Sequence, residues 1–397
     1  MSMMKDTARI SANKEPLIHI TKRDNLTWKN AILVRVLAII LAFIVTAIVI
    51  VCMTGKNPFE VFGSMFSGAF GSPLRMWILF SNTAILLGIA LALTPAFKMK
   101  FWNCGGEGQV LVGALATTCC MLFIGDSIPL PLLYIVMIIT SVAAGAIWGI
   151  IPSIFKALWN TNETLFTLMM NYIAIQLIVF FLKLFGDNGS GTLSTMKEFA
   201  VPHIFGDRYF FNILVVAIIC ALMYIYLRYS KHGYEISVVG ESENTARYVG
   251  INVRKVIIRT MLVSGALCGV IGFLLVANGS CTISSDLAGG QGFTAIMVSW
   301  LAKFNPLFMV LTAFLIIFLQ RGTNQIAIDF RVDTSLCDII IGIILFFIIG
   351  CEFFIQYKVH FGGPLKPIAD AIGGFFNKIG SIIKGIFTKK EKEEVEE

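Results

Sequence analysis

The chain has 397 residues, of which 57% are hydrophobic and only 14% are charged, and its formal net charge is +7. Soluble domains carry about 25% charged residues, so this chain holds too few charges to cover a water-exposed surface. In a soluble protein the positive charge would suggest nucleic-acid binding, but basic cytoplasmic loops of a membrane protein explain it better. The composition therefore favours an integral membrane protein and argues against nucleic acid as a partner.

Long stretches without Asp, Glu, Lys or Arg recur along the chain, and most of them reach the roughly 20 apolar residues that a helix needs to span a bilayer. They do not alternate between apolar and polar residues, as strands of a membrane β-barrel would. The predicted fold class is an all-α polytopic membrane protein with about ten transmembrane helices. The expected spans are 32–53, 76–96, 105–124, 130–151, 162–183, 209–228, 256–277, 291–302 (short for a crossing), 307–320 and 336–356.

The two ends of the chain differ from the part between them. Residues 1–30 are polar and basic and hold no apolar core, which predicts a cytoplasmic N-terminal segment without a cleavable signal peptide. The transmembrane domain is expected over 31–356. In the tail, 357–397, an amphipathic interfacial helix is expected at 368–387, followed by a disordered acidic end. Ten spans place both termini in the cytoplasm.

A glycine-rich stretch, Trp102–Gln109, holds three glycines, one carboxylate and two amide side chains directly before an apolar run. A charged side chain at mid-membrane costs roughly 2.5–3.5 kcal/mol on insertion scales, so Glu107 is expected to face a cavity, a partner or a substrate path. Residues 289–292 repeat the pattern five expected spans later, and an odd offset reverses direction across the membrane. This predicts an inverted repeat of five plus five spans. The alternative is coincidence, since the chain has 35 glycines.

The polar segment 229–255 is expected to be cytoplasmic because basic residues surround it. Its middle, Glu241 to Val249, predicts a short helix that Gly250 ends. Another helix is expected to begin at Asn162, with Asn as the cap and Glu163 in the first turn. The chain has no G-x-x-x-x-G-K-[ST] phosphate loop. Energy for any transport must therefore come from a partner or from an ion gradient.

Four stretches carry a family resemblance. Trp102–Gln109 resembles the aromatic-N-x-G-x-E-G-Q motif of permease subunits from ABC importers for nucleosides and simple sugars. Residues 162–174 resemble the N-E-x-x-x-T-x-M-x-N-Y-I-A stretch of the nucleoside branch. Residues 240–251, with 264–267 after them, resemble the cytoplasmic coupling loop and the next helix, and 290–296 resemble the second-half motif. The departures are Cys104, where an aliphatic residue is usual, and Thr245, where Pro or Ala is common.

The resemblance implies a permease subunit that moves nucleosides across the bacterial cytoplasmic membrane. It implies a second homologous permease subunit, a cytoplasmic ATPase with two nucleotide-binding cassettes, and an extracellular lipid-anchored substrate-binding protein. ATP and magnesium are then expected on the ATPase, and this chain is expected to bind no cofactor and to be no enzyme. The alternatives are a simple-sugar permease of the same kind, or an ion-coupled secondary transporter that needs no ATPase. A membrane-embedded enzyme is a weaker alternative, because the chain has no H-E-x-x-H motif or nucleophile elbow.

Two sets of residues are candidates for these roles. Amide and carboxylate side chains supply the paired donors and acceptors that ribose hydroxyls and base edges need. The predicted substrate path contains Asn103, Glu107, Gln109, Asn171, Gln176 and Gln291. The predicted ATPase-coupling residues are Glu241, Glu243, Asn244, Arg247, Tyr248 and Gly250. The alternatives are hydrogen bonding between neighbouring helices for the first set and an ordinary solvated loop for the second.

Overall fold

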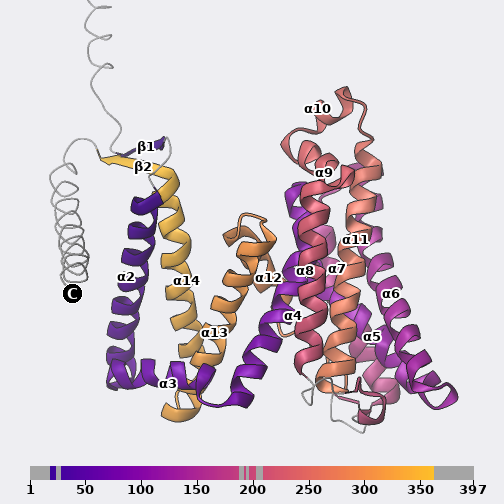
Figure 1. The fold of residues 1–397 in the computed structure, drawn as a ribbon, viewed down its shortest axis with the longest axis horizontal. Helices are drawn as coiled ribbons and strands as arrows, with labels where there is room; N and C mark the ends of the chain where they lie inside the picture. Colours follow the sequence, from indigo (N-terminus) through magenta and orange to yellow (C-terminus); the bar gives the residue numbers. More distant parts are fainter. Residues whose placement is uncertain (1–17, 24–27, 187–191, 194–195, 203–208, 362–397) are drawn as a thin grey trace, which may run out of the picture. The chain divides into compact units, whose positions relative to one another are not determined.

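The structure is a computed structural model that describes residues 18–23, 28–186, 192–193, 196–202 and 209–361. The described chain is almost entirely helical, which confirms the all-α prediction (Figure 1). It divides into two compact units: unit one comprises residues 1–61 and 332–397, and unit two comprises 62–331. The expected interfacial helix at 368–387, the acidic end and most of the basic N-terminal segment lie outside the described residues.

Unit one pairs two long helices, α2 (Trp28–Thr54) and α14 (Thr334–Gln356), which pack against each other. An ion pair joins them, with Arg35 Nη2 lying 3.2 Å from Glu352 Oε2. The strands β1 (Ile18–Lys22) and β2 (Tyr357–Phe361) form an antiparallel pair in which Ile20 lies opposite Val359. These strands were not predicted from the sequence.

Unit two contains the remaining elements. They are α3 (Pro58–Phe70, shared with unit one), α4 (Pro73–Lys98), α5 (Gly106–Ile124), η1 (Gly125–Ser127), α6 (Leu130–Trp159), α7 (Glu163–Phe185), η2 (Lys197–Phe199), α8 (Tyr209–Tyr229), α9 (Lys231–Glu241), α10 (Glu243–Tyr248), α11 (Val253–Leu274), the π-helical turn η3 (Leu275–Ser280), α12 (Gln291–Leu301) and α13 (Pro306–Phe330). Helix α7 starts as expected, because the Asn162 side chain accepts a hydrogen bond from the backbone N–H of Leu165 at 3.1 Å.

Within the described residues, nine helices are long and apolar enough to cross a membrane. The chain is therefore a multi-pass membrane protein, and the expected eighth span, 291–302, is too short to cross the bilayer as a helix by itself. Helix α12 has 11 residues and is about 16 Å long at 1.5 Å per residue, which is roughly half of the hydrocarbon core. Helix α13 also extends to Phe330 rather than ending at 320, so Arg321 lies inside a membrane-length helix.

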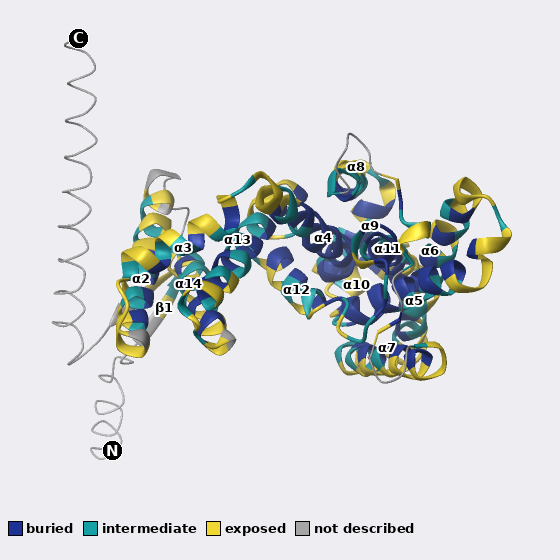
Figure 2. Cartoon of the chain, turned by 90° about the horizontal axis from the view of Figure 1, so that it is seen from below, coloured by how far each residue is buried: buried dark blue, intermediate teal, exposed yellow. Residues whose placement is uncertain are grey.

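Helices α4 and α11 form the centre of unit two, and both are largely buried (Figure 2). Helix α11 packs on α5 and α6, α4 packs on α12 and α13, and α4 and α11 pack on each other. If α4–α6 and α11–α13 are two repeats, the first helix of each repeat packs on the second and third helices of the other. This exchanged packing is the arrangement that two such repeats would produce. Glycines allow the close approach: a Cβ on Gly113 of α5 would lie 2.7 Å from the Cα of Gly269 on α11.

Candidate functional site

The two glycine-rich stretches meet at one buried carboxylate. Glu107 lies in the first turn of α5 and is only 7% exposed. Its Oε1 accepts a hydrogen bond from the backbone N–H of Gly290 at 2.9 Å, and its Oε2 accepts one from the N–H of Gly292 at 2.7 Å. We call these three residues the Glu107 junction. The segments that the sequence analysis paired as repeats are therefore in direct contact, start to start.

The start of α12 supplies what a buried carboxylate needs. The first N–H groups of a helix have no intrahelical partner, and the helix dipole makes that end partly positive. Gly290 has a φ of +71°, a left-handed conformation that suits glycine. A Cβ on Gly292 would lie 2.5 Å from the backbone nitrogen of Glu107. Glycine at 292 therefore allows the two helix starts to come close enough for the carboxylate to bond both N–H groups.

A second group of polar side chains surrounds the start of α5. Asn103 is completely buried, and its Oδ1 accepts hydrogen bonds from the Gly105 N–H at 3.0 Å and from Gln109 Nε2 at 3.3 Å. Its Nδ2 donates to the Ser264 hydroxyl of α11 at 3.2 Å. Gln109 is also buried. These amides are thus bonded to one another and to α11 in this conformation.

Helix α7 holds the backbone of the glycine-rich stretch from the other side. Asn171 accepts a hydrogen bond from the Gly108 N–H at 2.8 Å and donates one to the Cys104 carbonyl at 2.7 Å. One turn earlier, the Thr167 hydroxyl accepts from the Cys104 N–H at 3.2 Å. We call Asn103, Gln109 and Asn171 the amide cluster. Thr167 and Ser264 were not predicted as site residues, although the four-residue spacing of Thr167 and Asn171 placed them on one helix face.

The two remaining candidates for the path lie differently. Gln291 is the first residue of α12, between the two glycines of the Glu107 junction. Its side-chain oxygen is buried, and among the described residues no donor lies within hydrogen-bond distance of it. Gln176 is exposed on α7, and the structure does not bring it to the amide cluster. It lies five positions after Asn171, which is about 140° around a helix, so the two side chains point away from each other.

The predicted coupling residues form an exposed helical segment at one end of unit two (Figure 1). The expected single helix 241–249 is wrong in detail, because the chain breaks at Ser242, whose side chain caps α10 by accepting from the Thr245 N–H. Gly250 follows α10 with a φ of +84°, as expected for a helix stop. Tyr248 is 93% exposed.

The other predicted coupling side chains are also exposed. Glu241, Asn244, Glu243 and Arg247 all face outward, and the last two form an ion pair of 3.3 Å. Of the six residues of α10, only Ala246 is buried. An exposed helix with a single buried residue buries little of its own surface in this chain. Helix α10 is therefore a surface element rather than a core element.

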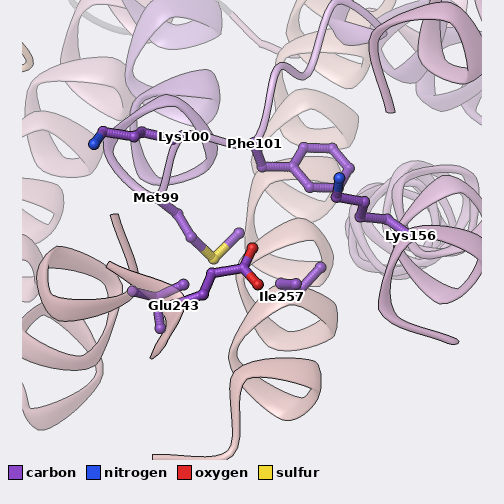
Figure 3. Close-up of a pocket in the computed structure, with 7 residues that line it drawn as sticks. Met99, Lys100, Phe101, Lys156, Glu243 and Ile257 are labelled. Carbon is purple, nitrogen blue, oxygen red and sulfur yellow. The ribbon is translucent and has the colours of Figure 1, made fainter. Parts of the chain in front are cut away.

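This segment packs on the turn that leads into the glycine-rich stretch. An apolar cluster joins α9, α10 and α11 to the end of α4; its buried members are Ala96, Met99, Phe101, Ile236, Val239, Ala246, Val253, Val256, Ile257 and Met261. A small pocket opens beside it, with Phe101 next to Lys156 on one side and Glu243 across from them (Figure 3). The Met99–Phe101 turn is therefore in contact with the exposed segment and ends two residues before Asn103.

One titratable group in the segment is perturbed. His232 is 4% exposed at the start of α9, and its Nδ1 is hydrogen bonded to the Tyr226 hydroxyl. Burial, together with the nearby Arg259 guanidinium, lowers the pKa of His232, and Glu235 opposes the shift. The folded chain therefore disfavours the charged form of His232. In the part of the chain that the structure describes, no three His, Cys, Asp or Glu side chains lie close enough together to hold a metal ion.

The described residues thus form a multi-pass membrane protein in which two glycine-led helix starts meet, with an exposed helical segment at one end. Residues 74–349 match the protein family described as "Branched-chain amino acid transport system / permease component", and the chain belongs to this family. The predicted relationship to ABC permeases is thereby confirmed.

Individual relatives cover most of the chain. It is 29% identical over 350 residues to a guanosine ABC transporter permease protein of Bacillus subtilis, an alignment that covers 84% of this chain and 97% of the relative. It is 28% identical over 358 residues to a nucleoside ABC transporter permease protein of Lactococcus lactis, covering 84% and 95%. It is 27% identical over 359 residues to a glucose ABC transporter permease protein of Haloferax volcanii, covering 85% and 93%.

Proposed function

We propose that this chain is the membrane subunit of an ATP-driven importer that carries nucleosides across the bacterial cytoplasmic membrane. The observation that carries the transport role is the Glu107 junction, where two helix starts from opposite halves of unit two meet inside a membrane permease. The nucleoside substrate is supported by the relatives named as guanosine and nucleoside permeases.

The junction and the amide cluster form the wall of the substrate path in this proposal. Asn103, Gln109 and Asn171 bond to one another or to backbone groups, so a substrate must displace those bonds to use the same atoms. In this proposal, the bonded arrangement corresponds to a closed path. The Gln291 oxygen is the acceptor already available to a ribose hydroxyl or a base N–H. Movement of α12 away from Glu107 would open the path, because the carboxylate holds both helix starts together.

The exposed segment α9–α10 is the docking surface for a cytoplasmic ATPase with two nucleotide-binding cassettes, on which ATP and magnesium are bound. Tyr248 is its most exposed aromatic side chain and is the expected centre of the contact. A displacement of α10 would reach the path through the apolar cluster and the Met99–Phe101 turn, since that turn continues into Asn103. The α10 end of unit two and both termini are then cytoplasmic.

Two further subunits complete the proposed importer. A second homologous permease subunit lies beside this one in the lipid bilayer, and a lipid-anchored binding protein delivers the substrate from outside. Gln176 is exposed on α7, so it lines the path only if the second subunit covers that face of the helix. The relative named as a glucose permease supports a second candidate function, import of a simple sugar. Ribose and glucose offer the same hydroxyl chemistry to amide side chains, so a transport assay must decide which substrate is carried.

Transport by the purified complex tests the proposal. The chain is co-expressed with its ATPase and binding protein, purified, and reconstituted in proteoliposomes. ATP-dependent uptake of guanosine that excess glucose does not inhibit is the expected result. Uptake of glucose instead would establish the sugar importer, and substrate uptake by this chain without any ATPase would refute both in favour of an ion-coupled transporter.

A further inference from the structure

Arg321 lies in α13, nine residues before the end of this helix at Phe330. That places it about 13 Å inside the helix end at 1.5 Å per residue. An ionisable side chain at such a depth is costly and is usually retained for a function. The positioning of Arg321 therefore requires an explanation that the Glu107 junction does not supply.

The partner of Arg321 is a neutral amide. With the Asn82 amide of α4 oriented so that its oxygen faces the guanidinium, this oxygen accepts hydrogen bonds from Arg321 Nε at 2.9 Å and from Nη2. Among the described residues no carboxylate lies within ion-pair distance of Arg321. The nearest acidic residue along the helix, Asp329, instead accepts from Gln325 at 2.6 Å and from the Ser64 hydroxyl. The positive charge of Arg321 is thus held in place without being neutralised.

The Asn82 contact leaves one edge of the guanidinium available. Five N–H groups form the planar fork of an arginine, and the two bonds to Asn82 use two of them. Three N–H groups remain, and two of them lie side by side on the edge formed by the two terminal nitrogens. Such an edge matches two adjacent acceptors, as in a carboxylate, a phosphate or the O6 and N7 atoms of guanine. Asn82 and Arg321 are both only partly buried.

An aromatic group lies on the same side of α13 as Arg321. Phe318 precedes Arg321 by three residues and so shares its helix face. Its ring centroid is 5.3 Å from that of Phe66 and 5.8 Å from that of Phe70, both on α3. These two α3 rings are 52% and 41% exposed. Helix α3 packs on α13 at this level, since a Cβ on Gly68 would lie 2.5 Å from the Gln325 Cβ and 3.2 Å from the Arg321 carbonyl oxygen.

We propose that Arg321, oriented by Asn82, forms together with the neighbouring rings of Phe66, Phe70 and Phe318 a binding subsite for the base of a 6-oxopurine nucleoside. The guanidinium edge donates to O6 and N7, and the rings cover a face of the base. Adenine presents a donor at its 6-position and cannot accept both bonds. The subsite therefore favours guanosine and inosine over adenosine. This inference rests on the proposed import of nucleosides and names the residues that would select among them.

The sharpest test is Asn82→Asp in the reconstituted importer. The new carboxylate is nearly isosteric, keeps the contact between α4 and α13, and neutralises Arg321 by an ion pair. We expect unchanged or higher thermal stability, a KM for guanosine raised about tenfold, and a KM for adenosine within about twofold. Arg321→Gln should give the same selectivity loss. Arg75→Gln is the matched control, because that exposed arginine donates to the Ser67 carbonyl near the same end of the unit.

Other outcomes overturn the inference. If Asn82→Asp changes the KM of guanosine and adenosine equally or not at all, Arg321 and Asn82 only connect two helices. If the effect of Arg321→Gln disappears in vesicles of purely neutral lipid, the guanidinium edge binds a lipid phosphate instead. If the unaltered complex imports no nucleoside, the proposed function and this inference fall together. Normal nucleoside import with unchanged selectivity in the variants refutes this inference alone.

Discussion

Replacing Glu107 by Gln tests whether the Glu107 junction controls the substrate path. The carboxylate uses one oxygen for each N–H group, at 2.9 Å and 2.7 Å. A glutamine has a single oxygen, so one N–H group loses its acceptor and faces an NH₂ donor instead. The remaining bond also changes from a charge-assisted one to a neutral one.

The size of the effect follows from these two bonds. Hydrogen bonds to charged groups contribute about 1.5–3 kcal/mol, and neutral ones contribute about 0.5–1.5 kcal/mol. Losing one hydrogen bond and weakening the other destabilises the joined arrangement of the two helix starts by about 2.5–4 kcal/mol. This is roughly a 60- to 700-fold change in the equilibrium between joined and separated helix starts. A neutral amide is easier to bury than a carboxylate, which offsets part of this loss in the stability of the whole unit. We therefore expect transport to fall at least about tenfold while the protein still folds.

The assay is ATP-dependent guanosine uptake by the reconstituted complex, with co-purification of the ATPase as the measure of assembly. Glu60→Gln is the matched control, because it removes an exposed carboxylate from α3. Loss of assembly together with uptake would mean that Glu107 serves packing between helices. Uptake within twofold of the unaltered complex would refute a controlling role of the junction.

Three further predictions concern the start of α12 and the docking segment. Gly292→Ala should destabilise the protein by about 1–3 kcal/mol, because its Cβ would overlap the first turn of α5. The control Gly342→Ala should not destabilise it, because a Cβ there meets nothing within 4 Å. Thermal unfolding measures both variants. Tyr248→Ala should weaken ATPase co-purification about tenfold or more without changing thermal stability, and Tyr229→Ala, at a 70% exposed position on α8, should not. The lowered pKa of His232 predicts that stability falls as the pH drops below about 6.5, because the unfolded chain then binds a proton that the folded chain resists. The unfolding temperature of His232→Gln should fall less between pH 7.5 and 5.5; equal slopes for the two proteins would contradict this assignment.

The sequence alone determined the membrane class, most of the helices and the main motifs. In lipid every backbone polar group must be bonded within the segment, so a long apolar stretch has few alternatives to a helix. Local signals were similarly sufficient where a side chain acts on its own backbone, as Asn162 does at the start of α7 and Gly250 after α10. The pairing of the two glycine-rich stretches was also visible, because similar residues recur at matching places.

The tertiary structure decided which of these polar groups meet. Both Asn171 and Gln176 stand on one apolar helix, but only the packing of α7 on α5 shows that Asn171 bonds the glycine-rich stretch while Gln176 faces outward. Likewise, hydropathy placed Arg321 outside the membrane span, because a charge ends an apolar stretch in sequence. Arg321 instead lies within the membrane-length helix α13. Its guanidinium is hydrogen bonded there to Asn82, which is more than two hundred residues away in the chain. Such contacts depend on the distances between helices, which no local pattern encodes.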